Sequence, residues 1–337
     1  MEFNFYLGCD LSQDDFHFCL RNKSTILLQG VVENSPKAIN RWISEMRKKN
    51  VVDLKQTLFC MEHTGIYGLF LLRVLQEKEL HACVESAMNI KLSLGLQRGK
   101  NDKIDAQRIA EYAMRYVDRL KLWKPRRPVI EELQLLIKLR ERLIKARKDL
   151  SRPIQDAKRF HTKANYQMLL EGSEATLMAI KRDMESVEKK ISELLQSDEN
   201  LKRISDLVQS VDGIGVVTCS MIIVKTNEFQ DITEAKKFAC TAGIAPFERS
   251  SGSSVKGKPR VSHMAHKDLK SILHLCAVGT IGRKGELRDY YLRKVAEGKN
   301  KMSVINAVRN KLVHRVFEVV KNKTMYQKNY QYLLVKS

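Results

Sequence analysis

The sequence predicts an α/β domain at the amino terminus followed by a longer, mainly helical region. Three observations support this division. The predicted strands all lie between residues 3 and 85, whereas apolar residues spaced by three and four begin at residue 129. Residues 1–100 carry 13 basic and 11 acidic side chains, but residues 241–337 carry 20 basic and 6 acidic ones. We therefore expect an α/β plus α protein in which chemistry and polyanion binding are partly divided between domains.

The amino-terminal region begins with three short β-rich runs separated by polar turns, which predict a three-stranded meander. Two strand and helix units follow, so the element order is βββαβαβα. This order is typical of the ribonuclease-H-like fold, although other α/β sheets share it. Strands are expected at 3–9, 16–20, 26–32, 57–61 and 80–85, and helices around 36–49, at 66–78 and up to about 117.

A connection and two long helices are expected next. The segment WKPRRP at 123–128 contains two prolines and predicts an exposed linker. Beyond it, apolar spacing predicts two long helices, and Pro153 and the Gly172-Ser173 pair interrupt the pattern. We expect a helical hairpin or a dimerising coiled coil at 129–198. The predicted domains are 1–125, a helical spacer at 126–200, and a mainly helical, basic domain at 201–337.

The composition predicts a protein that binds a polyanion. The 337 residues carry a formal net charge of +21, while 43% are apolar and 29% charged, near globular averages. No apolar run approaches the ~20 residues of a membrane helix, and no secretory signal precedes the first strand. The seven cysteines contain no C-x-x-C pair, so we expect reduced core residues in a cytoplasmic protein.

Four carboxylates are placed where strand ends and one helix would bring them together. Asp10 follows the first predicted strand and Glu62 closes the strand at 57–61, and ligands bind at such strand ends. Asp102 and Asp105 are three residues apart on a predicted helix, so their side chains lie within about 60° of one another. Converging carboxylates repel unless cations neutralise them, so we predict a site for two Mg²⁺ or Mn²⁺ ions. Taken singly, each is also explained as a turn or cap residue.

A Ser- and Gly-rich stretch is the second candidate site. Ser250, Ser251 and Gly252 follow the helix-breaking sequence AGIAP at 242–246. A serine in a flexible loop among cations can attack a phosphodiester, although a polar loop that only contacts phosphates is the simpler interpretation. The neighbouring cations are Arg249, Lys256, Lys258 and Arg260.

Two further patterns carry less information. The Gly213-Ile214-Gly215 turn, as in helix-hairpin-helix elements, can offer backbone N–H groups to a DNA phosphate, or is only a tight turn. His263, His266 and His274 lack an obvious fourth ligand, which favours surface or core histidines over a zinc site.

Taken together, these stretches resemble the insertion-sequence transposases that pair a RuvC-like DEDD domain with a carboxyl-terminal serine domain, a group related to the pilin-gene invertases. The signatures are Glu-x-Thr-Gly-x-Tyr from Glu62, Asp-x-Ile-Asp-Ala from Asp102, and Gly-x-Ala-Pro followed by Ser-Gly from Gly243. The matching stretches are YLGCDLSQDDFHFCL (6–20), MEHTGIYGLFLLRVL (61–75), NDKIDAQRIAEYA (101–113), VDGIGVVTCSMI (211–222) and FACTAGIAPFERSSGSSVKGK (238–258).

The resemblance implies a recombinase that cuts and rejoins the DNA of an insertion element without a nucleotide cofactor. Ser251 falls on the family's nucleophilic serine, with Ser250 as the nearest competitor. The family's metal-binding carboxylates fall on Asp10, Glu62, Asp102 and Asp105. Relatives tend to have glycine and arginine where this chain has Ala265 and Lys270, and lysine gives up bidentate phosphate geometry.

The resemblance also implies partners. RNA-guided members of the family imply a structured non-coding RNA beside the DNA of the element ends and target. The two sites lie far apart in the chain, so we hypothesise a homodimer or homotetramer in which one protomer's carboxylates serve another's serine. Such a protein would be cytoplasmic and nucleoid-associated in a bacterium.

Three other functions compete with this interpretation. A Holliday-junction-resolving endonuclease would use the same carboxylates with water as nucleophile. A non-catalytic nucleic-acid-binding protein would use only its basic half. An actin-like sugar kinase also begins with a strand and an Asp, but the sequence lacks a second glycine-rich phosphate loop at a fitting place.

Overall fold

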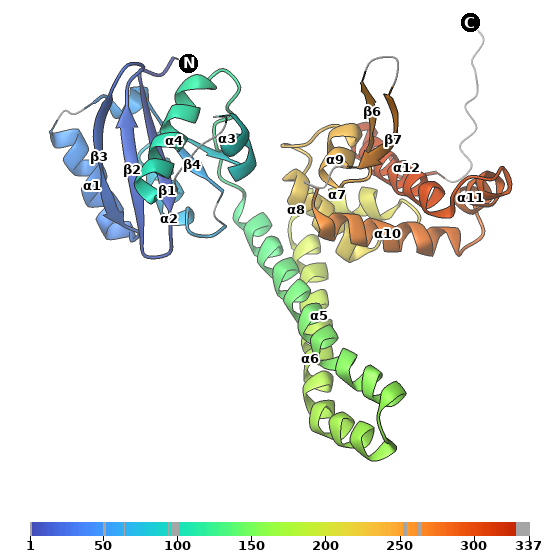
Figure 1. Ribbon diagram of the computed structural model, residues 1–337. Coiled ribbons are helices and arrows are strands. Elements are labelled where there is room, and N and C mark those ends of the chain that lie inside the picture. Colours follow the sequence, from blue (N-terminus) through green and yellow to red (C-terminus); the bar gives the residue numbers. More distant parts are fainter. Residues whose placement is uncertain are drawn as a thin grey trace, which may run out of the picture. The chain divides into compact units, whose positions relative to one another are not determined.

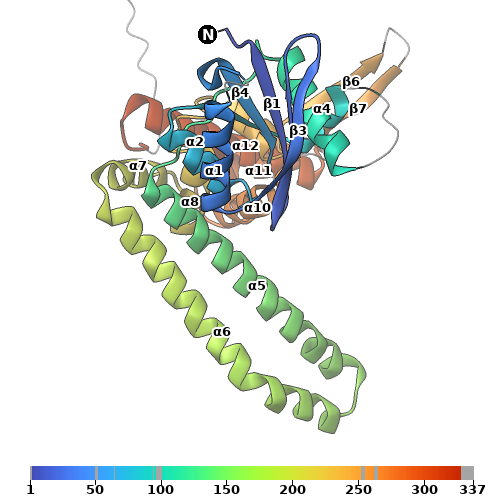
Figure 2. The same ribbon diagram turned by 90° about the vertical axis from the view of Figure 1, so that its left-hand side faces the viewer.

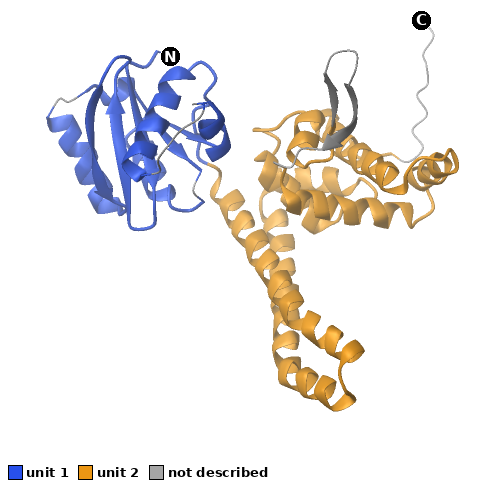
Figure 3. Ribbon diagram, in the orientation of Figure 1, with its two compact units in different colours: residues 1–125 blue, residues 126–337 orange. Residues whose placement is uncertain are grey.

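The structure is a computed structural model in which the chain divides into two compact units, residues 1–125 and 126–337 (Figure 3). It describes residues 2–49, 52–63, 65–93, 95, 101–251, 255–261 and 265–327. The side chains of 247–251 and 255–261 lie outside this description. The two units meet in the sequence within the proline-containing stretch 123–128.

The first unit is built on a five-stranded sheet with the order β3-β2-β1-β4-β5 (Figure 1). The strands β1, β2 and β3 form the predicted antiparallel meander, and β4 and β5 run parallel to β1. This arrangement confirms a mixed α/β sheet. The strands are β1 Phe5–Leu11, β2 Asp15–Arg21, β3 Ile26–Glu33, β4 Thr57–Glu62 and β5 His81–Glu85.

Helices cover both faces of the sheet. On one face, α1 (Pro36–Lys48) and α2 (Leu69–Glu77) bury alternate strand residues against Trp42 and Leu71. On the other face, α4 (Asp102–Arg115) packs on β1 and β2 and buries Ala106 and Ala110. Alternation of side chains along each strand explains why the sheet supplies both cores. A short helix α3 (Ala87–Ser93) and a 3₁₀ turn (Leu54–Gln56) complete the unit.

The second unit begins with a long helical hairpin formed by α5 (Pro128–Phe160) and α6 (Lys163–Ser197) (Figure 2). The hairpin is confirmed, but its expected interruptions are wrong, because Pro153 and Gly172 lie inside the helices. Both positions are exposed, and nothing lies within 4 Å of a Cβ added at Gly172. On an exposed helix face, a proline that lacks a backbone N–H and a glycine with a flexible backbone both leave the packing of the core unchanged. Thr162 caps α6 after the turn instead.

The rest of the second unit is a helical bundle that shares one apolar core with the base of the hairpin. The bundle helices are α7 Glu199–Gln209, α8 Val216–Thr226, α9 Ala235–Thr241, α10 Lys267–Ile281, α11 Glu286–Ala296 and α12 Lys301–Asn322. The serine-rich segment was expected to be a loop, but β6 (Pro246–Ser251) and β7 (Val255–Val261) pair there as antiparallel strands. Pairing satisfies backbone groups that an extended loop would leave to water.

Arg127 anchors the start of α5 to two distant parts of the second unit. Its guanidinium donates to Asp198 at 2.8 and 2.9 Å and to Glu228 at 2.8 and 2.5 Å. Arg127 also lowers the pKa of Asp198 to about 2. The Glu228 side chain is 1% exposed, and the backbone at Asn227, Glu228 and Phe229 is left-handed, with φ of 49°, 56° and 62°. The sequence offered no sign of this network.

The cysteines are unpaired and mostly lie in the core, as the sequence predicts. All seven cysteines are free, and all but Cys240 are buried. Burial raises the pKa of Cys219 to about 12 and that of Cys9 well above its ordinary value, so these thiols stay protonated. No helix in the described part of the chain has the length and apolar character needed to span a membrane.

Candidate functional site

The position of Asp10 is explained by the glycine two residues before it. Asp10 is the next-to-last residue of β1, and alternation places it on the same face as Gly8. A Cβ atom at Gly8 would lie 2.3 Å from both Ala106 O and Ala110 N of α4. Only glycine therefore lets α4 lie directly on β1 at this point. This close packing brings α4 to the strand that carries Asp10.

Asp102 and Asp105 both lie in the first turn of α4. The N-cap residue is Asn101, whose side-chain oxygen accepts a hydrogen bond from Lys103 N at 2.9 Å. The alternative in which Asp102 caps the helix is therefore wrong. Asp105 accepts a hydrogen bond from Arg108 Nη1 at 2.7 Å. The partial positive charge of a helix N-terminus favours carboxylates at these positions.

The pKa of Asp10 responds to the other three predicted carboxylates. Burial raises the pKa of Asp10 to about 6. The negative charges of Asp105, Asp102 and Glu62 add to this rise, whereas His17, directly opposite on β2, lowers the pKa. A carboxyl group with such a pKa resists ionisation because its surroundings are poor in water and rich in negative charge.

Glu62 closes β4 and lies beside a further carboxylate, Glu85, that the sequence pattern did not reveal. In the parallel register, Glu62 is paired with Glu85, the last residue of β5. Glu85 accepts hydrogen bonds from Tyr112 OH and Asn89 Nδ2, both at 2.9 Å, and from Ser86 N at 2.7 Å. Burial, together with the hydrogen bond to Glu85, raises the pKa of Tyr112. Glu85 therefore links β5 to α4, and its position at a strand end was the signal that could have found it.

The donor set at this sheet edge fits a hard divalent cation. Asp10, Glu62, Asp102 and Asp105 offer carboxylate oxygens, which Mg²⁺ and Mn²⁺ prefer. A cation would also relieve the repulsion that raises the pKa of Asp10. Among the residues that the structure describes, no group of three or more Asp, Glu, His or Cys side chains lies close enough together to hold a metal ion. These carboxylates would therefore have to turn toward a bound ion, and Asp105 could do so through the oxygen that Arg108 does not contact.

The predicted nucleophile lies at the end of β6. Ser251 is opposite Val255 and Ser250 is opposite Lys256 in the antiparallel register of β6 and β7. The predicted site side chains in this hairpin, and Gly252, lie outside the described residues. They are Arg249, Ser250, Ser251, Lys256, Lys258 and Arg260.

The residue two positions before β6 is held by α12. Asn306 donates a hydrogen bond from Nδ2 to Ile244 O at 2.8 Å. On the same segment, Ile244 N donates to Ala239 O at 3.0 Å. The strands β6 and β7 with their connection are called the serine hairpin below, and its base is therefore fixed to the helical bundle.

The predicted glycine turn joins α7 to α8. Gly213 has φ of 90°, and a Cβ there would lie 2.0 Å from Thr280 Oγ1 of α10, so this position requires glycine. Gly215 is the N-cap of α8, where no described side chain caps the helix and nothing lies within 4 Å of an added Cβ. The first N–H groups of α8 therefore receive no side-chain cap from its N-cap residue.

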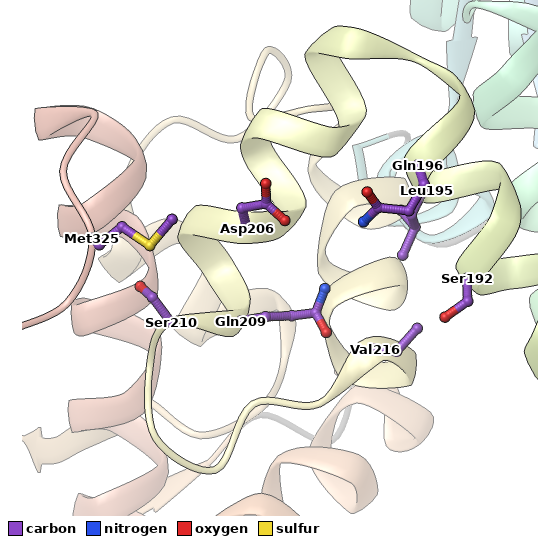
Figure 4. A pocket seen from close by; sticks show the side chains of 8 residues that line it. All are labelled: Ser192, Leu195, Gln196, Asp206, Gln209, Ser210, Val216 and Met325. Carbon is purple, nitrogen blue, oxygen red and sulfur yellow. The ribbon is translucent and has the colours of Figure 1, made fainter.

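A cavity of about 490 Å³ lies near this turn, among α6, α7 and α8 (Figure 4). Ser192 and Gln196 line it from α6, and Asp206 and Gln209 from α7. Its described lining contains one carboxylate and no basic side chain. Such a lining does not favour binding of a phosphate group, so we do not assign this cavity to nucleic-acid binding.

The fold and the two candidate sites define a class of protein. A mixed α/β unit with carboxylates at one sheet edge precedes a basic helical unit, an organisation that suits an enzyme acting on nucleic acid.

Comparison with known proteins specifies the family. Residues 7–157 match the IS110 DEDD transposase family, described as Transposase, and residues 205–292 match the Transposase IS116/IS110/IS902 family. The chain therefore carries two stretches similar to insertion-sequence transposases and is a DNA transposase or recombinase.

Relatives agree with this assignment. A pilin gene-inverting protein of Moraxella lacunata is 26% identical over 346 residues, which cover 96% of this chain and 98% of that protein. A pilin gene-inverting protein of Moraxella bovis is 26% identical over 241 residues, 70% of each chain. The insertion element IS110 uncharacterized 43.6 kDa protein of Streptomyces coelicolor is 25% identical over 153 residues, 45% of this chain and 36% of that protein.

Proposed function

We propose that this transposase cuts and rejoins DNA through a covalent phosphoserine link formed by Ser251. The observation that carries the proposal is the electrostatic coupling of Asp10 to Asp102, Asp105 and Glu62. Grouped carboxylates destabilise a fold unless a bound cation compensates them, so their presence at one sheet edge favours a functional role.

The first unit is proposed to be a RuvC-like domain of the ribonuclease-H-like fold. Support comes from its antiparallel meander, its two parallel strands and the helix α4 packed across β1. Asp10, Glu62, Asp102 and Asp105 would hold two Mg²⁺ or Mn²⁺ ions. Such ions supply charge that polarises a scissile phosphate and favours loss of a proton from an attacking hydroxyl.

In the proposed reaction, Ser251 Oγ attacks the phosphorus of one DNA strand. The Oγ–P bond forms while the bond from phosphorus to one deoxyribose oxygen breaks, and the Oγ proton is lost to a carboxylate or to water. A hydroxyl of the second strand then attacks the phosphoserine, which joins the strands and restores the serine. The number of phosphoester bonds is conserved, so no ATP is needed.

The remaining contacts are proposed from charge and backbone geometry. The cations of the serine hairpin would hold phosphate oxygens, as would backbone N–H groups of the turn that contains Gly213 and Gly215. The cations are Arg249, Lys256, Lys258 and Arg260.

A homodimer or homotetramer and a structured guide RNA complete the proposal. Leu135, Phe160 and Met168 on the hairpin of α5 and α6 are 63%, 73% and 64% exposed, and exposed apolar side chains of this size favour contact with another copy. The formal charge of +21 suits RNA as well as DNA. The proposed setting is the bacterial cytoplasm, in association with the nucleoid.

The test is a denaturing gel that detects covalent protein–DNA adducts. The reaction contains full-length protein, element-end DNA, the adjacent non-coding RNA and Mg²⁺. We expect an adduct with the wild type and with Ser250→Ala, and none with Ser251→Ala or Asp102→Ala. Cleavage that persists in Ser251→Ala without any adduct would instead identify an endonuclease that uses water.

Mixing variants tests whether the two sites act between protomers. Asp10→Ala and Ser251→Ala proteins are each expected to be inactive, and their mixture should recover part of the activity. Failure of confirmed mixed assemblies to recover any activity would exclude sharing between copies.

A further inference from the structure

Arg309 on α12 is a buried cation for which the structure describes no carboxylate partner. Its residue surface is 5% exposed, and its Nε atom has no hydrogen-bond partner among the described residues. Burial lowers its pKa, and no nearby described charge opposes that effect. Buried charges are normally paired, because the loss of hydration must be offset. The fold therefore keeps a positive charge inside the second unit without a described counter-charge.

The contact of Arg309 with His274 determines which ring nitrogen of the histidine carries the proton. Arg309 Nη2 lies 3.1 Å from His274 Nδ1 on α10. A guanidinium N–H can only donate, so Nδ1 accepts and the neutral imidazole carries its proton on Nε2. His274 is partly exposed, and no described residue accepts a hydrogen bond from Nε2. The pair therefore presents an oriented N–H donor backed by a buried positive charge.

The surroundings place this donor beside the serine hairpin. Lys270 lies one turn before His274 on α10 and adds positive charge on the same side of that helix. Asn306 lies one turn before Arg309 on α12, and it is the residue that holds Ile244 O at 2.8 Å, two residues before β6. Arg309 and the base of β6 are thus fixed by neighbouring turns of one helix.

We propose that Arg309 and His274 form an anion site that takes one phosphodiester group of bound DNA beside the serine hairpin. His274 Nε2–H contacts a phosphate oxygen. Arg309 is a positioning residue that fixes the histidine tautomer and supplies the charge that the phosphate neutralises. The choice of DNA rests on the proposed function, whereas the anion site itself does not.

A role of Arg309 in phosphate binding and a purely structural role predict opposite effects of the substitution Arg309→Met. Methionine approximates the length of the arginine stem without its charge, and apolar replacement of an uncompensated buried charge is often neutral or stabilising. If Arg309 serves phosphate binding, Arg309→Met keeps or raises the melting temperature and loses the anion response. If Arg309 only holds α10 to α12, Arg309→Met melts earlier and any anion response remains.

The first experiment uses full-length protein and inorganic phosphate as the probe. Melting temperature is measured against phosphate concentration, with chloride adjusted to constant ionic strength. We expect phosphate to stabilise the wild type and His314→Leu, a control at an exposed histidine on α12. Arg309→Met and His274→Leu should lose this shift, and His274→Gln should retain part of it, because its amide can both accept and donate. If Arg309→Met does not fold, the two His274 variants decide the outcome.

The second experiment measures binding of element-end DNA at several salt concentrations. Arg309→Met should weaken binding by about tenfold at low salt. It should also reduce the slope of log K against log salt by about 0.9, the value for one phosphate contact. The control His314→Leu should change neither quantity. A parallel RNA duplex of the same sequence tests the choice of nucleic acid.

The results separate this proposal from the serine mechanism. Unchanged phosphate stabilisation in both Arg309→Met and His274→Leu overturns the anion site. An effect on RNA binding without an effect on DNA binding overturns the assignment to DNA. If the phosphate response behaves as expected but the wild type forms no serine adduct, the anion site stands and the proposed serine chemistry fails.

Discussion

Replacing Asp10 by asparagine should stabilise the protein while abolishing its activity. The pKa of Asp10 rises from 3.8 to about 6 on folding, so its ionised form is disfavoured in the native state. One pKa unit corresponds to about 1.4 kcal/mol, which sets an upper limit of about 3 kcal/mol. Because Asp10 is partly exposed and solvent screens its charge, we expect a gain of about 1–2 kcal/mol at pH 8 without metal.

The pH dependence of this gain follows from linkage. Between about pH 4 and 6 the native state binds the Asp10 proton more tightly than the unfolded state does, so the wild type loses stability as pH rises. Asp10→Asn lacks this loss. The advantage of the variant should therefore be absent near pH 4, grow up to about pH 6 and stay constant above it.

Urea unfolding of the two proteins across this pH range measures the effect. Added Mg²⁺ should narrow the difference at pH 8, because an ion that binds the native carboxylates stabilises the wild type. Asp14→Asn, at an exposed carboxylate between β1 and β2, is the matched control and should show no such pH-dependent gain. The repulsion argument would be refuted if the Asp10→Asn protein were less stable than the wild type at pH 8. It would also be refuted if the difference in unfolding free energy between the two proteins did not change with pH.

Two further predictions concern packing and the Arg127 network. Gly8→Ala should destabilise the first unit by about 1–3 kcal/mol in urea unfolding, because the new methyl group overlaps the α4 backbone. Gly172→Ala, at an exposed position, should instead stabilise α6 by up to about 1 kcal/mol. Equal effects of the two substitutions would contradict the packing argument. Arg127→Ala should cost about 3–5 kcal/mol because it leaves the buried Glu228 carboxylate without a positive partner, with only the hydrogen bond from Asn200 remaining. A cost below about 1 kcal/mol would argue against the network. Since Arg127 holds the pKa of Asp198 at about 2, the wild type should lose stability as pH falls from about 4 to 2, and Arg127→Ala should lose less over that range.

The sheet could be predicted because its signal is local. Alternating apolar residues and short polar turns place β1 to β3 at nearly the expected positions. The serine hairpin could not be predicted in the same way. The residues of β6 and β7 are mostly polar or small, so their pairing has no apolar period to reveal it. At Pro153 the sequence predicted an interruption that the structure lacks. The proline lies on an exposed face of α5, and the helix continues through it.

The candidate site was accessible to sequence reasoning only in part. Asp10 was found because it follows a predicted strand and Glu62 because it closes one. Glu85 also closes a strand and was overlooked. What distinguishes Glu85 is its set of hydrogen-bond donors from α3 and α4, which exists only in the folded unit. Burial without a described counter-charge likewise separates Arg309 from the many surface cations of this chain.

The sequence alone determined the secondary-structure periods, the charge difference between the two ends and the chemical types available at each site. Those properties depend on side-chain identity and short-range spacing. Only the tertiary structure decided that α4 rests on Gly8, that Asp10 is hard to ionise, and that Arg127 meets Glu228. These properties depend on which distant segments meet and how much water they exclude, because the energy of a charge or a contact is set by its folded surroundings.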